Sequence, residues 1–333
     1  MMRFLSACSL LLLVVQHLSA QSPADSVQSL AGADSSYVGK YARKNMVRLF
    51  YGARGNSLTY ESYKGSSPNL QGSLYRNIGD YLGFGITYRW IDVDASIALP
   101  GTTYLKEERS NLEQFNLSVR FTTRRLAFRG YYMDATGVVS ASANDQYVSP
   151  PAAHESRLGI QMMYFLNGSR YSYRAALYQN EVQRRSAGSF LIGTEVFYRD
   201  LSTSQGLSVA SYDIAPRYGD QAGMKTLQAP GILLTPGYAY TKVWKEGRYF
   251  VSGLLSAGAG VAFNRYHANA GSNTRNNLET AANLMFSGGY NGPQYFVRVL
   301  VLAYSRYELI DPAFLMSTNL MVDVMVGWRF GQL

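Results

Sequence analysis

Apolar and polar residues alternate with a period of two along most of this chain. In the last such segment, residues 321–330, one parity carries only large apolar side chains and the other carries both charges, Asp323 and Arg329. Successive side chains of a β-strand point to opposite faces, so the pattern predicts a strand with one apolar and one polar face. There is little sign of the 3.6-residue period of an amphipathic helix.

Segments of the same kind recur from residue 46 onward. They are residues 46–63, 82–90, 91–99, 114–121, 125–132, 158–166, 171–179, 189–199, 207–214, 237–244, 249–263, 278–290, 295–307 and 321–330. The regular ones contain about 9 to 11 residues, the length with which a tilted strand crosses a bilayer. The sequence therefore predicts an all-β chain made of membrane-crossing strands.

The connections between these segments alternate between short and long. Residues 167–169, 245–247 and 291–293 are short, whereas residues 100–111, 134–156, 264–275 and 308–317 are long. Short turns at one end and long loops at the other are typical of a transmembrane, antiparallel, up-and-down β-barrel. With both termini on the short-turn, periplasmic side the number of crossings must be even, and we expect 14. Twelve is the alternative, if residues 189–214 form an extracellular hairpin.

A soluble exported β-sandwich is the other fold that alternates in this way, with its apolar face turned inward. Arginines at mid-strand on the polar parity and aromatic residues near strand ends both favour the barrel. A wet lumen tolerates the first, and the interfacial girdles of a membrane barrel account for the second.

Composition agrees with an exported membrane barrel. Charged residues make up 16% and aromatic residues 14%, with 27 tyrosines, which is unlike an ordinary soluble domain. Hydrophobic residues at 47% exclude a disordered chain. The single cysteine, Cys8, lies in the N-terminal leader, so the mature chain has neither a disulfide nor a thiolate.

The first residues have the three regions of a secretory signal peptide. Arg3 precedes the apolar run of residues 10–15, and Leu18-Ser19-Ala20 provides the small-residue cleavage site. A membrane anchor is the alternative, but the run is far shorter than the roughly 20 residues that span a bilayer. We expect residues 1–20 to be cleaved, residues 21–45 to form a periplasmic tether, and residues 46–333 to form a barrel in the outer membrane.

Charged residues on the polar parities are the main candidates for function. These expected lumen charges are Arg48, Arg89, Arg120, Arg125, Arg129, Arg174, Arg298, Arg329, Asp92, Asp94, Glu195 and Asp323. An arginine facing lipid would cost roughly 2 to 4 kcal/mol at mid-membrane, so they should point inward. They form either a structural network of ion pairs or, because arginine is in excess, a narrow anion-preferring, porin-like passage.

Residues 165–198 carry the most specific motif, FLNGSRYSYRAALYQNEVQRRSAGSFLIGTEVFY. This block resembles the central signature of the domain-of-unknown-function family 4421 of Gram-negative outer-membrane β-barrel proteins. Further matching pieces are Leu82-Gly83-Phe84-Gly85 and Pro236-Gly237-Tyr238-Ala239-Tyr240. The resemblance implies the location and the fold, and it implies no activity and no functional residues.

Catalytic chemistry has little support. His154 and His267 are the histidines of the mature chain, both expected in extracellular loops, and His154-Glu155-Ser156 is the only hint of a surface hydrolase. We predict no enzymatic activity, no cofactor and no metal site, and the dispersed basic residues argue against nucleic acid. The expected role is a passage or a structural or accessory envelope protein.

The expected partners belong to the envelope. The chain has a formal charge of +9, and basic residues such as Arg184, Arg185 and Arg217 could pair with the phosphates of lipopolysaccharide among the outer-membrane lipids. Trp328 and Phe330 are the candidate docking signal for the barrel-assembly machinery. We expect a monomer.

Overall fold

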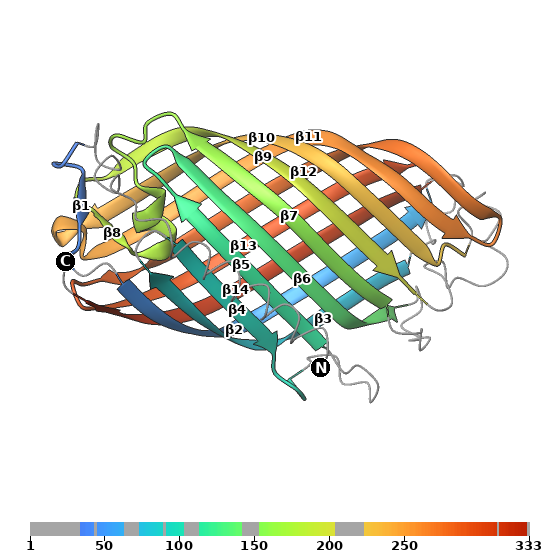
Figure 1. Cartoon of the computed structure of the whole chain (residues 1–333), viewed down its shortest axis with the longest axis horizontal. Helices are drawn as coiled ribbons and strands as arrows, with labels where there is room; N and C mark the ends of the chain where they lie inside the picture. The colour runs from blue at the N-terminus through green and yellow to red at the C-terminus, as the bar shows by residue number, and fades with distance from the viewer. Residues whose placement is uncertain are drawn as a thin grey trace, which may run out of the picture.

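The structure is a computed structural model that describes residues 34–42, 45–62, 73–88, 91–102, 113–141, 153–203, 223–311 and 313–331. Within these ranges the chain forms a closed barrel of twelve antiparallel strands (Figure 1). The barrel strands are β2 (Asn45–Ser62), β3 (Ser73–Tyr88), β4 (Ile91–Ala98), β5 (Glu113–Thr122), β6 (Leu126–Ala141), β7 (Ala153–Phe165), β9 (Ala187–Ser202), β10 (Thr226–Trp244), β11 (Tyr249–Ala268), β12 (Gly271–Asn291), β13 (Tyr295–Ile310) and β14 (Ala313–Phe330). Pairing of β14 with β2, with Val324 opposite Tyr51, closes the barrel.

Burial in this barrel is inverted relative to a soluble protein. Large apolar side chains point outward, and Phe190 and Ile160 are 66% and 64% exposed. Charged side chains point inward, and Arg329 and Glu308 are both 0% exposed. A surface of this kind is stable when lipid, and not water, surrounds it. The predicted orientation of the alternating strands is therefore confirmed, and the sandwich alternative is wrong.

Aromatic pairs flank the outward apolar band at both ends of the barrel. At the short-turn end, Trp328 lies opposite Tyr295 in the ladder and stacks on Phe330 at 5.4 Å between ring centroids. At the long-loop end, Tyr307 stacks on Phe314 at 5.2 Å. Aromatic rings prefer the polar–apolar boundary of a bilayer, so these pairs mark the two edges of the embedded band.

The strand count of 14 is wrong and the alternative of twelve is correct, although by a different route. Residues 189–199 belong to a barrel strand, β9, and do not form an extracellular hairpin. Residues 171–179 form no strand and fold inside the barrel around the π-helical turn η2 (Arg174–Tyr178). Nearly every side chain of this stretch is buried, so it lacks the lipid-facing parity of a crossing strand. The expected strand at 207–214 lies outside the described residues.

A plug occupies the short-turn end of the barrel. It consists of residues 34–42 and 167–186, joined by a two-stranded sheet in which β1 (Val38–Lys40) pairs with β8 (Glu181–Gln183). Both strands lie at the left end of the barrel in Figure 1. The largest apolar core of the described residues forms where the plug meets the inner barrel wall, around Phe165, Tyr171 and Leu177.

Part of the plug comes from the segment that was expected to be a tether, because residues 34–42 are folded against the barrel. The expected signal peptide, residues 1–20, lies outside the described residues. Among the residues that the structure does describe, no helix is both long and apolar enough to span a membrane.

The outward position Val322 tests the membrane orientation. It lies on β14 between the two aromatic edges and is 40% exposed. We expect Val322→Arg to lower the free energy of unfolding by about 2 to 4 kcal/mol, because its charge would face the acyl chains. Urea unfolding in lipid vesicles measures the effect.

The matched control is Thr226→Arg, at the exposed end of β10, where the same charge reaches the interface and should cost about 0 to 1 kcal/mol. Equal costs at the two positions would contradict the membrane orientation.

Candidate functional site

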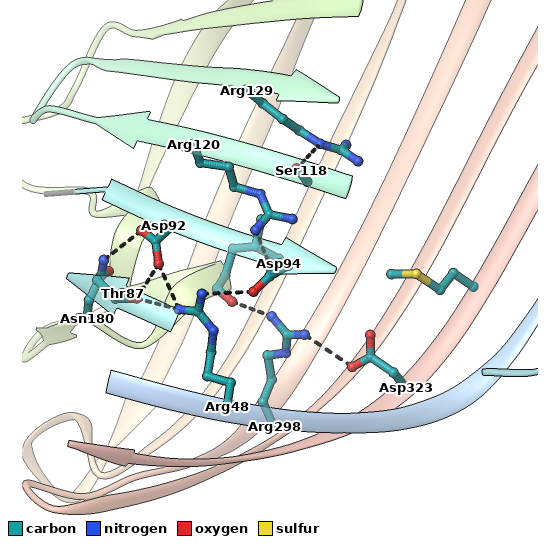
Figure 2. A network of polar contacts seen from close by, with 12 residues as sticks. Arg48, Thr87, Asp92, Asp94, Ser118, Arg120, Arg129, Asn180, Arg298 and Asp323 are labelled. Atoms are coloured by element: carbon teal, nitrogen blue, oxygen red, sulfur yellow. Dashed lines mark hydrogen bonds and ion pairs between the residues drawn. The ribbon is translucent and has the colours of Figure 1, made fainter. Parts of the chain in front are cut away.

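A network of buried charges lies inside the barrel wall formed by β2 to β5 (Figure 2). The guanidinium of Arg48 donates to Asp92 at 2.7 Å, to Asp94 at 2.9 Å and to Thr87 at 2.6 Å. Arg120 forms the second ion pair of Asp94. Arg48 is 2% exposed, so its charge is stabilised by these carboxylates and not by water.

Gly85 provides the space for this network. A Cβ atom at this position would lie 2.0 Å from Oδ1 of Asp94 and 2.8 Å from Nε of Arg48. Any larger residue would therefore push the pair apart. The two glycines of residues 82–85 thus reflect close packing on the inner face, of Phe50 above Gly83 and of charged side chains above Gly85.

A second group of ion pairs crosses the lumen toward the long-loop end. Arg306 pairs with Glu195 and with Glu279, and Arg199 pairs with Glu308. Arg157 donates to Glu155 at 2.6 Å. Except for Glu195, these residues were not among the lumen charges predicted from the sequence. They share the inward parity of residues that were recognised: Arg306 follows Arg298 on β13, and Arg199 follows Glu195 on β9.

Side chains of β12 to β14 hold the plug by donating to its main-chain carbonyl groups. The donor–acceptor pairs are Ser287 to Ala176 (2.8 Å), Arg298 to Leu177, Arg329 to Gln179, and Asn291 to Glu181 (3.0 Å). Buried carbonyl groups must find donors, and the short turn η2 cannot supply them. We call these four donors the plug clamp. Two expected lumen charges, Arg298 and Arg329, therefore hold the plug.

Tyr41 ties the N-terminal part of the plug to the same clamp. Its ring lies 3.9 Å from the guanidinium carbon of Arg329, and its hydroxyl donates to the carbonyl of Asn291 at 2.7 Å. Burial raises the pKa of Tyr41 to about 12, although the charge of Arg329 opposes that rise. The phenol is therefore neutral and remains a donor at physiological pH.

A cavity of about 250 Å³ lies between the plug and the ion pairs of the long-loop side. Tyr173, Leu177 and Tyr178 of the plug form its floor. The charged part of its wall contains six arginines and three carboxylates, namely Arg48, Arg54, Arg120, Arg129, Arg157, Arg298, Asp94, Glu195 and Asp323. The cavity is therefore both enclosed by the barrel and rich in positive charge.

Most of the expected lumen charges point inward from the barrel strands. These are Arg48, Arg120, Arg129, Arg298, Arg329, Asp92, Asp94, Glu195 and Asp323. Arg125 was assigned incorrectly: it lies in the turn before β6, is exposed, and donates to the hydroxyl of Tyr164 at 3.3 Å. Arg174 lies in the plug and not on a strand, 3.7 Å from Glu181. Arg89 lies outside the described residues.

The two histidines lie at the long-loop end, on strands and not in loops. His154, on β7, is 3.1 Å from Asp134, and both side chains share the outward parity of their strands. Within the described ranges the His154 ring bonds to no serine. His267 contacts Ser272 at 3.0 Å. No three metal-ligating side chains gather among the residues that the structure describes.

Two of the basic residues expected near lipopolysaccharide lie at the opposite end. Arg184 donates to the carbonyl of Ser35, and Arg185 lies 5.7 Å from the centre of the Tyr37 ring, so both belong to the plug. Arg217 lies outside the described residues. The sequence suggested an outer position because residues 171–179 were counted as a crossing strand.

A family model matches residues 32–330, which is nearly the whole chain including the plug, and its description is "Domain of unknown function (DUF4421)". The chain belongs to the DUF4421 family. The resemblance seen in residues 165–198 is thereby confirmed. No curated protein matches the DUF4421 chain.

Several solved barrels match the DUF4421 protein over most of their length. The outer membrane protease OmpT from Escherichia coli is 10% identical, with 87% of this chain and 98% of that chain covered and a TM-score of 0.36. The toluene transporter TodX from Pseudomonas putida is 9% identical, with coverages of 90% and 98% and a TM-score of 0.30. OmpT of Vibrio cholerae, an outer membrane protein, is 11% identical, with coverages of 85% and 98% and a TM-score of 0.31. These scores are too low to carry an argument about activity.

Removal of Arg48 tests the buried network of the DUF4421 protein. We expect Arg48→Met to lower the free energy of unfolding by about 3 to 5 kcal/mol, because it leaves the carboxylate of Asp92 buried without its cation. Adding Asp92→Asn should recover part of this loss. Urea unfolding in vesicles gives both values.

Arg125→Met, at the exposed turn, is the control and should change stability by less than about 0.5 kcal/mol. A similar, small effect of Arg48→Met would show that the network does not stabilise the barrel.

Proposed function

We propose that this protein is an integral outer-membrane barrel that provides a plugged, anion-preferring passage and not a permanently open pore. The plug at the short-turn end is the observation that carries this proposal. It fills the mouth with buried aromatic side chains and is bonded to the barrel by the plug clamp. Passage of a solute then requires that the plug shift.

The outward apolar band supports the membrane location, because a belt of exposed leucine, valine and aromatic side chains is unfavourable in water. Its aromatic edges support the same location. We assign the short-turn end, with the plug, to the periplasm, as in other bacterial barrels. The long-loop end then faces outward.

The charge distribution supports a preference for anions. Ion pairs neutralise many of the inward arginines, and Arg298 and Arg329 serve the plug clamp, so the lumen is not a simple ring of free positive charge. The cavity wall nevertheless carries more arginines than carboxylates. An excess of arginine attracts anions and repels cations.

The expected partners remain part of this proposal. Outer-membrane lipids and lipopolysaccharide would surround a monomeric barrel. Trp328 and Phe330, stacked at the outer surface near the end of β14, are positioned for recognition during insertion. The His154 ring contacts Asp134 and, among the described residues, no serine, so this pair gives no support to the surface-hydrolase alternative.

Planar bilayer recordings of the purified protein test the plug. We expect little steady conductance from the unmodified chain. The double variant Arg298→Met, Arg329→Met should raise the time-averaged conductance by about tenfold or more, because each lost charge-assisted hydrogen bond is worth about 1.5 to 3 kcal/mol. The open state should prefer anions.

Arg125→Met is the matched control and should behave like the unmodified protein. A heat-dependent gel shift shows that each variant forms the barrel. High conductance from the unmodified chain, equal to that of the double variant, would contradict the plugged state.

A further inference from the structure

Two arginines of the cavity have no carboxylate partner. Arg48, Arg120, Arg157 and Arg298 each form an ion pair with an acidic side chain. Arg54 and Arg129 form none with any of the described residues. Both side chains are half-buried, and a charge in such a position costs free energy without a counter-charge, so this pair needs an explanation.

The contacts of Arg54 are weak for a guanidinium inside a barrel. One nitrogen, Nη2, donates to the sulfur of Met321 at 2.9 Å, and the group lies 4.7 Å from the centre of the Tyr81 ring. The other nitrogen, Nη1, is buried and has no hydrogen-bond partner. A thioether is a poor acceptor, so Arg54 retains unused donor capacity.

Arg129 also has contacts with neutral groups. Its Nε donates to Ser118 at 3.1 Å (Figure 2), and its guanidinium carbon lies 5.3 Å from the centre of the Tyr131 ring. Arg54 and Arg129 both line the cavity, so their positive charges face the same space. Asp323 attracts Arg54, but its two oxygens are bonded to Arg298 and Tyr81, each at 3.1 Å.

One part of the cavity wall is apolar and adaptable. Its side chains are Met163, Leu254, Met285, Leu300, Leu302, Met321 and Met325. On β13 the two leucines lie between Arg298, on the plug side, and Tyr304, on the long-loop side. Methionine side chains are flexible and fill irregular space, which suits a surface that takes up an alkyl chain. One cavity thus combines a cationic wall with an apolar wall.

We propose that this cavity binds a small amphiphilic monoanion, of the class of medium-chain carboxylates, with its carboxylate between Arg54 and Arg129. The planar guanidinium fork matches the two oxygens of a carboxylate. The alkyl tail lies on the methionine and leucine wall. A volume of about 250 Å³ is roughly eight water volumes, which fits a ligand of roughly ten heavy atoms and excludes a whole lipid. Such an anion would be a solute of the proposed passage. The site rests on that proposed function only for the route by which the ligand reaches the lumen.

Isothermal titration calorimetry of the full chain in a non-ionic detergent tests the site, with octanoate as the probe and detergent alone as the blank. We expect saturable binding of octanoate, and at least about tenfold weaker binding of octan-1-ol and of inorganic phosphate. Arg54→Met and Arg129→Met should each weaken octanoate binding about tenfold or more, as expected for a lost charge-assisted hydrogen bond. The control Arg125→Met should bind octanoate like the unmodified chain.

Met285→Trp provides an independent test, because it fills the apolar side and leaves both arginines in place. It should abolish octanoate binding while retaining the heat-dependent gel shift of a folded barrel. Three results would overturn the proposal: equal affinity for octan-1-ol, equal affinity for phosphate, or undiminished octanoate binding in Met285→Trp or in both arginine variants. Binding is measured at equilibrium and without a bilayer, so this experiment is independent of the conductance recordings. Octanoate binding can be absent while the recordings support the plugged state, and octanoate can bind while the recordings contradict it.

Discussion

The pairing of charges inside a lipid-facing barrel is the constraint on which the other features of this structure depend. Once the apolar parity faces acyl chains, the charged side chains within the embedded band must point inward, into a space too narrow to hydrate all of them. The pairs Arg48–Asp92 and Arg199–Glu308 show how the barrel meets this requirement: β4 supplies the carboxylate for Arg48 of β2, and β13 supplies the one for Arg199 of β9. Where no carboxylate is supplied, the arginines bond to plug carbonyl groups or face the cavity. The plug and the cavity therefore arise from the same excess of inward arginine.

The barrel and the orientation of its side chains could be predicted from the sequence because period-two alternation is a local signal. Residues 321–330 show this well, with apolar residues outward and Asp323 and Arg329 inward. The plug was not predicted, because residues 171–179 also alternate, and the structure distinguishes them from a crossing strand by their burial on both faces. That error also led to the wrong positions of Arg174, Arg184 and Arg185. A signal was present: this stretch carries tyrosine at 171, 173 and 178 next to small alanines, with no run of large aliphatic residues for lipid.

The candidate site was partly visible before the fold was known. The inward charges followed from parity, and applying the parity along the whole of β13 and β9 would also have found Arg306 and Arg199. Which arginines are paired, and which are left for a ligand, depends on contacts between strands far apart in sequence. That Arg54 and Arg129 face one cavity, and that Arg298 reaches the carbonyl of Leu177, is set by barrel closure and has no local signature.

The composition of the plug from two distant segments has a consequence for the order of assembly. β1 precedes the first barrel strand, its partner β8 lies in the middle of the chain, and the donors that clamp the plug lie on β12 to β14. β1 can pair with β8 before the last strands join the barrel, but the clamp can be completed only with β12 to β14 in place. The strand that closes the barrel against β2 also carries Arg329, so closure of the seam and completion of the clamp depend on the same strand.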